Sequence, residues 1–351
     1  MPRFIVSYSI GYQEIKDKIK IMKNTTSNQV SSVTVDLNDK SQRLVNLEKA
    51  FKTGTFVLKN SSVDFERLNR VLSDLDKFYN LDSEKKTEIS EQTSGEGATR
   101  GYFPLGAESG LADVFEKKES YSFGWPDEEI PDSQISSLSL VAPNVFPTNG
   151  CLNQDDVAGL IKDFADTAKQ IAKLLADILS NGEITLPIDE TSDFQSLLRS
   201  FRYYKKNESD PANTGANSLH TDWNLITLVY TDADGFQYRD NDGNFQNLVP
   251  ENDKCLIVNF GDFLSSWSDG RIVSPWHQVV DTKKKQIRNS LVFFYYPAAA
   301  SPAVKNPIYN QDEALSLFVD QSDRVNKLWD FTKVNTMNEM YAEKWKQVSR
   351  D

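Results

Sequence analysis

The N-terminal part of the chain alternates short apolar runs with segments whose apolar residues recur every three or four positions. Residues 33–37 and 54–60 are apolar runs bounded by polar residues and glycine, a pattern typical of strands. Residues 41–52 and 64–79 carry their apolar side chains on one stripe, as amphipathic helices do. The pattern predicts the order strand, helix, strand, helix.

The longest regular segment is a helix predicted over residues 154–181. Its apolar stripe consists of Leu160, Phe164, Ala168, Ile171, Leu175 and Ile178. Asn181 and Gly182 follow the last periodic residue and provide a stop signal. We interpret this helix as a scaffold that backs a barrel and takes no part in a functional site.

The second half of the chain is rich in short strands. Runs of β-branched and aromatic residues lie at 198–204, 223–230, 272–280 and 291–296. Residues 232–235 and 240–243 resemble the start of a calcium loop, but neither continues into the EF-hand spacing, so we interpret both as turns. Residues 311–351 return to a helical pattern and are expected to pack outside the strands.

Composition excludes several classes of protein. The formal net charge of −12 argues against a nucleic-acid partner, which needs a basic face. No apolar run approaches the ~20 residues that cross a membrane, and residues 1–30, a predicted flexible leader, lack the features of a secretory signal. Cys151 and Cys255 are too few for a disulfide framework. We expect a cytoplasmic monomer, with organelle targeting by the leader left open.

The candidate chemistry is concentrated between residues 220 and 290. The chain has two histidines, and both His220 and His277 lie in this stretch. Residues i and i+2 of a strand face the same side, so His220 and Asp222 can reach one metal ion, which His277 joins from a distant strand. Two imidazoles and one carboxylate form the facial triad of non-haem Fe(II) oxygenases, whose open positions accept a co-substrate and O2.

Arg288 and Ser290 form a second i, i+2 pair, on the strand that leads into residues 291–296. A guanidinium holds a carboxylate in a bidentate manner, and a hydroxyl adds a third hydrogen bond. A dicarboxylate could therefore chelate the metal at one end and be held by this pair at the other. Considered without the histidines, the pair fits an exposed strand surface equally well.

These residues together resemble a known family. The matching motifs are His220-Thr221-Asp222, His277 and Arg288-Asn289-Ser290, with Arg100-Gly101-Tyr102 and Gly261-Asp262 as further matches. The ordered set is similar to the HxD…H…RxS signature of Fe(II)/2-oxoglutarate dioxygenases, and more narrowly to the isopenicillin-N-synthase-like group. The resemblance covers about residues 33–300.

The resemblance implies a fold and a division of the chain. The fold is mainly β with helical additions: a double-stranded β-helix (a cupin-like jelly roll) with an N-terminal α/β scaffold and C-terminal helices. The expected parts are the leader at 1–30, a dioxygenase-type N-terminal region at 31–150, the jelly-roll core at 151–310 and C-terminal helices at 311–351. The implied cofactor is Fe(II), with 2-oxoglutarate and O2 as co-substrates.

Other predicted site residues lie near the same strands. Family members often place a tyrosine on the strand at 198–204 that touches 2-oxoglutarate or a substrate carboxylate, which suggests Tyr204. Arg202 stands where many members have asparagine; it is predicted to bind a substrate carboxylate, with a partly exposed strand arginine as the equal alternative. The remaining pocket candidates are Trp223, Asn224, Val292 and Phe294, although aromatic residues in strands more often belong to the core.

The function implied by the resemblance is oxidation of a C–H bond of a small organic substrate, by hydroxylation, desaturation or ring closure. Arg202 suggests an amino-acid-derived metabolite. One alternative is an iron oxidase that does not use 2-oxoglutarate, in which Arg288 and Ser290 would hold a substrate carboxylate. A second alternative is a non-catalytic jelly roll that uses the site for binding.

Overall fold

The computed structural model describes the chain from residue 32 to residue 348, with gaps. The described residues are 32–90, 100–108, 114–135, 137–138, 140–180, 185–281, 285–303 and 334–348. The predicted leader at 1–30 and most of the predicted C-terminal helices at 311–351 lie outside them. None of the described helices is long and apolar enough to cross a membrane.

The centre of the fold is an eight-stranded sheet. Its order is β1 (Thr34–Asp36), β2 (Thr55–Lys59), β12 (Leu256–Phe260), β9 (Ile226–Thr231), β14 (Ile287–Tyr295), β6 (Leu197–Tyr204), β5 (Lys118–Phe123) and β3 (Gly101–Phe103). All neighbours pair in antiparallel fashion except β1 and β2, which are parallel. Strands from the N-terminal region therefore extend the same sheet that the later strands form.

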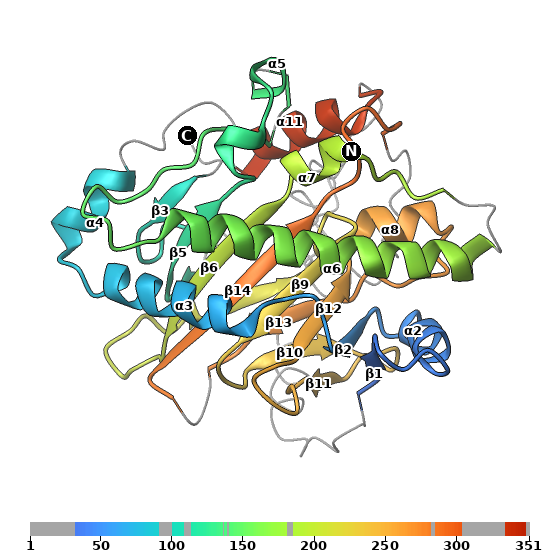
Figure 1. The fold of residues 1–351 in the computed structure, drawn as a ribbon. Coiled ribbons are helices and arrows are strands. Elements are labelled where there is room, and N and C mark those ends of the chain that lie inside the picture. The colour runs from blue at the N-terminus through green and yellow to red at the C-terminus, as the bar shows by residue number, and fades with distance from the viewer. Residues whose placement is uncertain are drawn as a thin grey trace, which may run out of the picture.

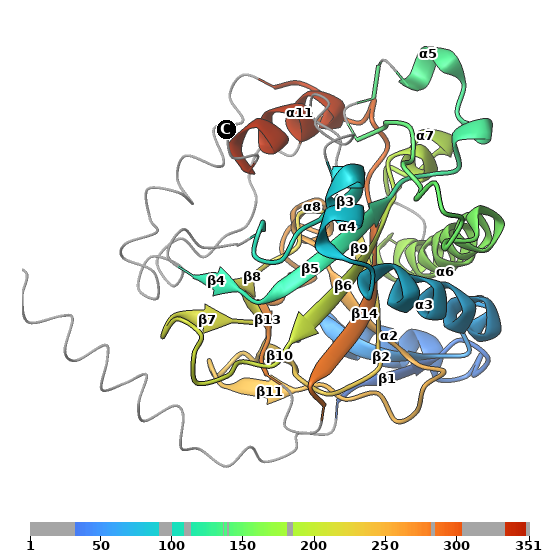
Figure 2. The same ribbon diagram turned by 90° about the vertical axis from the view of Figure 1, so that its left-hand side faces the viewer.

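A smaller sheet lies against one face of the large one (Figure 2). It contains β11 (Phe245–Asn247), β10 (Phe236–Arg239), β13 (His277–Val279) and β8 (Asn217–His220), and a separate short pair is formed by β4 (Phe115–Glu116) and β7 (Thr214–Gly215). An apolar cluster that includes Val229, Phe236 and Val292 fills the space between the two sheets. This arrangement is the predicted jelly roll.

Helices cover the opposite face of the large sheet (Figure 1). They are α6 (Gln154–Ser180) and α3 (Phe65–Tyr79). The other helices of the described residues lie around the edges and ends of the sheets: α2 (Arg43–Ala50), α4 (Ser83–Ser90), α5 (Asp132–Ile135), the 3-10 turn η2 (Asp127–Glu129), α7 (Glu190–Phe194), α8 (Asp262–Trp267) and α11 (Met337–Val348). The side chain of Asp64 caps α3 by accepting hydrogen bonds from the first free backbone amides. The long helix α6 thus backs the sheet, as its apolar stripe predicts.

The two faces of the large sheet have different roles, and β14 shows the division. Leu291, Phe293 and Tyr295 belong to the core between sheet and helices, where the Phe293 ring stacks on Phe164 of α6 at 5.6 Å between centroids. Because side chains alternate along a strand, Arg288, Ser290 and Val292 point to the other face, toward the smaller sheet. We call this face the inner face and the helix-covered face the outer face.

Replacing Phe164 by alanine should remove a large side chain from the centre of the outer core. Phe164 is fully buried, so the cavity and the lost apolar burial should lower the free energy of unfolding by about 3–5 kcal/mol. Urea unfolding followed by circular dichroism measures this change. Lys173→Ala, at an exposed position of the same helix, is the matched control and should change stability little; equal effects would contradict the assignment of α6 to the core.

Candidate metal centre

The two histidines are brought together by strand pairing. His220 is the last residue of β8 and His277 the first of β13, and the two are direct register partners in the antiparallel pair. Their rings lie 4.3 Å apart between centroids. Asp222 lies just beyond the end of β8, so it follows the strand rather than sharing it as the sequence suggested, yet its carboxylate still reaches both histidines.

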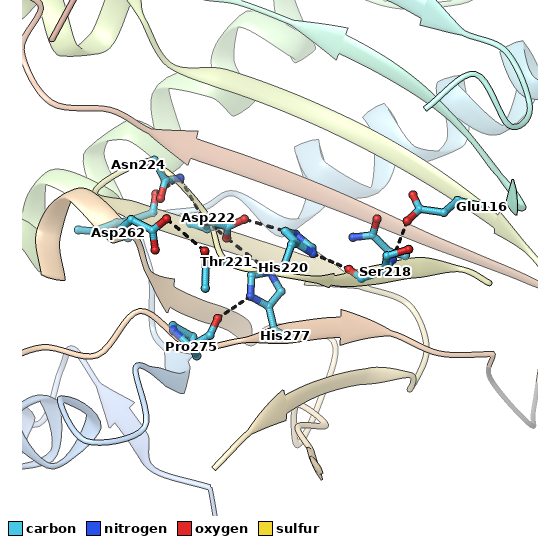
Figure 3. Close-up of polar contacts among 12 residues, drawn as sticks. Glu116, Ser218, His220, Thr221, Asp222, Asn224, Asp262, Pro275 and His277 are labelled. Atoms are coloured by element: carbon cyan, nitrogen blue, oxygen red, sulfur yellow. Dashed lines mark hydrogen bonds and ion pairs between the residues drawn. The ribbon is translucent and has the colours of Figure 1, made fainter. Parts of the chain in front are cut away.

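One nitrogen of each imidazole faces the carboxylate of Asp222 (Figure 3). The Nε2 atoms of His220 and His277 are each 3.6 Å from an Asp222 oxygen, and one ligand atom from each of the three residues lies within 4.8 Å of the others. Three donor atoms so arranged can bind one small cation on a common face.

The opposite ring nitrogens are held by backbone carbonyls. His220 Nδ1 lies 2.7 Å from the carbonyl oxygen of Ser218, and His277 Nδ1 lies 3.0 Å from that of Pro275. A carbonyl can only accept, so each Nδ1 carries the proton and each Nε2 keeps its lone pair for a metal. The Phe236 ring stacks on His277 and fixes its plane.

A short relay of hydrogen bonds orients the carboxylate. Thr227 Oγ1 donates to Asp222 Oδ2 at 2.7 Å and accepts from Asn224 Nδ2 at 2.9 Å. The backbone amide of Asp262 donates to the carbonyl of Asp222 at 2.7 Å. A Cβ on Gly261 would come within 2.1 Å of the Asn224 carbonyl, so the Gly-Asp motif lets α8 approach the loop that carries the ligand.

Electrostatics in the cluster suits a cation. Burial acts to raise the pKa of Asp222, but the interactions with the two imidazoles and the hydrogen bond from Thr227 outweigh it and hold that pKa well below its usual range. Burial lowers the pKa of His277 to about 4, so this imidazole is neutral near pH 7. Burial would also lower the pKa of His220, but the hydrogen bond and charge of Asp222 outweigh it and raise that pKa. The site thus offers a carboxylate and a ready imidazole ligand.

Arg288 and Ser290 form a separate candidate anion site on the inner face of β14. Arg288 is 2% exposed and donates from Nε to the carbonyl of Asp234 at 3.0 Å. Among the described residues, its Nη1 and Nη2 and the buried Oγ of Ser290 have no hydrogen-bond partner. Buried donors of this kind are normally satisfied, so they require a ligand with several acceptor oxygens. The distal carboxylate of 2-oxoglutarate meets that requirement.

Tyr203, which sequence reasoning missed, completes this anion site. It is the register partner of Arg288, and the guanidinium lies 5.0 Å from the centre of its ring. Directly opposed residues share a face of an antiparallel sheet, so Tyr203 points inward. The pairing register of β6 with β14 would have identified Tyr203, but this register cannot be read from the sequence alone.

The predictions for Arg202 and Tyr204 require correction. Both lie on the outer face: Arg202 is opposite Asn289, binds Asp76 at 3.0 Å and Asn80 at 3.2 Å on the α3 side, and therefore has its anionic partner away from the metal site. The hydroxyl of Tyr204 donates to Glu119, also on this face. The two residues do share a face, as predicted, but it is the helix-covered one.

Of the other pocket candidates, Asn224 contacts residues of the protein that support the metal ligand, and the role of Phe294 in a pocket stays a prediction. Asn224 is fully buried and binds Thr227, so it supports the metal ligand rather than lining a pocket. Phe294 is opposite Thr227 on the inner face. Trp223 is partly buried and packs against Tyr296 and Tyr341 near the same end of the sheet.

Comparison with known proteins identifies the class to which this fold and site belong. Residues 195–297 match the 2OG-Fe(II) oxygenase superfamily, and residues 29–149 match the family described as non-haem dioxygenase in morphine synthesis N-terminal. The match to the superfamily spans the triad, Arg288 and Ser290.

Individual relatives agree with this assignment. The chain is 24% identical to a 1-aminocyclopropane-1-carboxylate oxidase of Dictyostelium mucoroides, with 90% of this chain and 91% of the relative covered. It is 26% identical to a 2-oxoglutarate-dependent dioxygenase of Dothideomycetidae sp., with 81% and 89% covered. The structure of a full-length Neurospora crassa protein in complex with alpha-KG matches with a TM-score of 0.66 at 20% identity, covering 92% of this chain and 97% of that one.

The chain therefore belongs to the 2OG-Fe(II) oxygenase superfamily. It is a non-haem Fe(II)- and 2-oxoglutarate-dependent oxygenase, and its fold, enzyme class and cofactors are those that the sequence predicted.

Replacing Thr227 by valine should weaken iron binding. The change keeps the shape of the side chain but removes the hydrogen bond to Asp222, and loss of such a supporting contact costs about 10- to 100-fold in metal affinity. Anaerobic Fe(II) titration measures this. Thr231→Val is the control, because Thr231 donates to the Ala233 carbonyl and not to a ligand. Unchanged affinity in Thr227→Val would show that Asp222 is positioned without the relay.

Iron affinity should also fall as the pH drops through the pKa of His220. A proton on its imidazole competes with the metal, and the raised pKa moves this competition above the usual 6.5. His277, with a pKa of about 4, should contribute no proton competition in the same range. Anaerobic titrations between about pH 8 and about pH 5.5 test this, and a constant affinity across that interval would contradict it.

Proposed function

We propose that this oxygenase oxidises a C–H bond of a small organic substrate held between the two sheets. In this proposal His220, Asp222 and His277 hold Fe(II), while Arg288 and Ser290, with Tyr203 beside them, hold 2-oxoglutarate. The observation that carries the proposal is the set of buried, unpartnered donors on Arg288 and Ser290, on the inner face of the large sheet, which faces the smaller sheet that carries the two histidines. A dicarboxylate with a keto group next to one carboxylate can chelate the metal at that end and bind Arg288 and Ser290 with the other carboxylate.

The residues present fit these groups. Bound iron and 2-oxoglutarate would supply the oxidising power for O2-dependent attack on an unactivated C–H bond. The chain itself contributes position: backbone carbonyls set the protonation of both histidines, and Thr227 orients the carboxylate of Asp222. The buried apolar residues Val229, Phe236 and Val292 exclude water from the space beside the triad.

The iron oxidase that does not use 2-oxoglutarate is the second candidate. It is favoured by the relatives in two Dictyostelium species, each 24% identical, which carry the name 1-aminocyclopropane-1-carboxylate oxidase. In that case Arg288 and Ser290 would bind a carboxylate of another molecule. An amino-acid-derived substrate no longer finds support in Arg202, which is paired with Asp76.

Binding of 2-oxoglutarate by Arg288 can be tested without a known substrate. Anaerobic addition of Fe(II) and then 2-oxoglutarate should produce a weak visible charge-transfer band only when both are present. Arg288→Met should raise the 2-oxoglutarate concentration needed for this band by about 100-fold, because it removes charge-assisted hydrogen bonds of about 1.5–3 kcal/mol each. Iron affinity in the absence of 2-oxoglutarate should stay unchanged.

The matched control for this experiment is Arg202→Met. Arg202 is also a buried arginine, on the neighbouring strand β6, but it faces the helices. This variant should require the same 2-oxoglutarate concentration as the wild type. Iron binding without a band in the wild type would favour the oxidase that does not use 2-oxoglutarate, and no iron binding would favour the non-catalytic jelly roll. A monomeric state and a cytoplasmic location stay predictions.

A further inference from the structure

The inner face of the sheet carries a second charged cluster, which the metal and 2-oxoglutarate do not use. On β6, Arg199 has the same orientation as Tyr203, because its register partner on β14 is Val292. On the adjacent strand β5, Ser120 lies opposite Phe201 and therefore on the same face. Glu108, from the segment that precedes β4, joins Arg199 there.

Arg199 is held firmly but incompletely satisfied. Its Nη2 donates to both carboxylate oxygens of Glu108, each at 2.6 Å, and to Ser120 Oγ at 3.0 Å. Its Nε is buried and, among the described residues, has no hydrogen-bond partner. The guanidinium lies 5.2 Å from the ring centre of Phe103 and 4.8 Å from that of Phe201. Two aromatic rings and one carboxylate thus fix its position while donor capacity remains.

The neighbouring cation on this face has a different role. Lys118 donates to Glu116 and to Asn217, both at 2.5 Å. Glu116 in turn accepts from the backbone amide of Ser218, whose carbonyl holds Nδ1 of His220 (Figure 3). Lys118 therefore supports a metal ligand and has its partners within the protein. Of the two cations in this cluster, Arg199 is the one whose buried donor has no partner among the described residues.

Arg199 lies near the reacting centre. In the sheet, Arg199 is opposite Val292, which is opposite Val229 on β9, two residues from Thr227. A molecule that contacts Arg199 can therefore extend along this inner face toward the iron ligands.

We propose that Arg199, held by Glu108 and Ser120, recognises a carboxylate of the primary substrate, and that this substrate is a small organic acid with an apolar, planar body. The proposal rests on the function proposed above. The carboxylate would accept from the guanidinium donors that the protein leaves unused, as charge-assisted hydrogen bonds require. The body would lie against the aromatic side chains of this face, Phe103, Phe201 and Phe294.

The charges favour an acid over an amine. Both oxygens of Glu108 already accept from Arg199, so the negative charge of this pair is neutralised. The guanidinium, by contrast, retains a buried donor, and a substrate acceptor that satisfied it would recover its desolvation cost. An amine would instead have to compete with Arg199 for Glu108.

Pairs of an acid and its amide can test this on the loaded enzyme. The protein is saturated with Fe(II) and 2-oxoglutarate without oxygen, and the charge-transfer band is recorded first. Phenylacetate and 3-phenylpropionate are then compared with phenylacetamide and 3-phenylpropionamide by calorimetric titration. The wild type should bind each acid about tenfold to a hundredfold more tightly than its amide.

The decisive variant is Arg199→Gln combined with Glu108→Gln, which removes both charges and leaves neither partner buried alone. It should lose the preference for acids while keeping the band. Arg199→Lys, which retains the charge but not the planar fork, should keep part of the preference and guards against a folding defect of the double variant. Arg202→Gln, three residues along the same strand but on the outer face, should keep all of it.

The charge-transfer band distinguishes failure of the proposed function from failure of the proposed role of Arg199. Failure of the proposed function would appear as absence of the band before any acid is added. With the band present, equal or undetectable binding of acids and amides by the wild type overturns the role of Arg199. So does an acid preference that survives in the double variant, or acid binding that abolishes the band by displacing 2-oxoglutarate from Arg288.

Discussion

The antiparallel pairing of β8 with β13 is the constraint on which the site depends. It places His220 directly opposite His277, although the two residues are far apart along the chain. Each imidazole is turned by the carbonyl two residues before it, so the strand backbones set both the position and the protonation of the ligands. The carboxylate of Asp222 then needs only the loop after β8 and one threonine to complete the triad.

The two faces of the large sheet have different functions: the outer face packs against helices, and the inner face carries the candidate binding residues. Its outer face packs against α3 and α6 and contains polar pairs such as Arg202 with Asp76, which link strand to helix. Its inner face holds Arg288, Ser290 and Arg199, each with a buried donor that has no partner among the described residues, whereas on the outer face Arg202 also keeps an unpartnered Nε beside its ion pair. The difference is that both terminal nitrogens of Arg288 are unpartnered where small molecules are expected, while the terminal nitrogens of Arg202 bind Asp76 and Asn80 on the helix side.

The sequence was sufficient for the features that are local or fixed by residue type. Helix α6, the strand character of the second half and the triad followed from periodicity, from strand alternation and from the small number of histidines. The prediction failed where the outcome depended on which face of a strand is covered. Arg202 and Tyr204 alternate correctly with Tyr203, but their facing is decided by the register of β6 against β14 and by the helices behind them. Asn224 was misassigned because its hydrogen bond to Thr227 depends on how the loop between the two residues turns, which the sequence does not show.

Strand β6 therefore behaves as two interleaved sets of positions. Arg199, Phe201 and Tyr203 belong to one set and Ser200, Arg202 and Tyr204 to the other. During evolution or engineering, the first set can change what the enzyme accepts while the second maintains the attachment of the helices. Deletion of a single residue within β6 would reverse the facing of every later side chain in the strand. Side chains that bind the helices would then point to the inner face. Substitutions at alternate positions of β6 can therefore change substrate specificity without disturbing the helices, whereas insertions and deletions in this strand would disturb both.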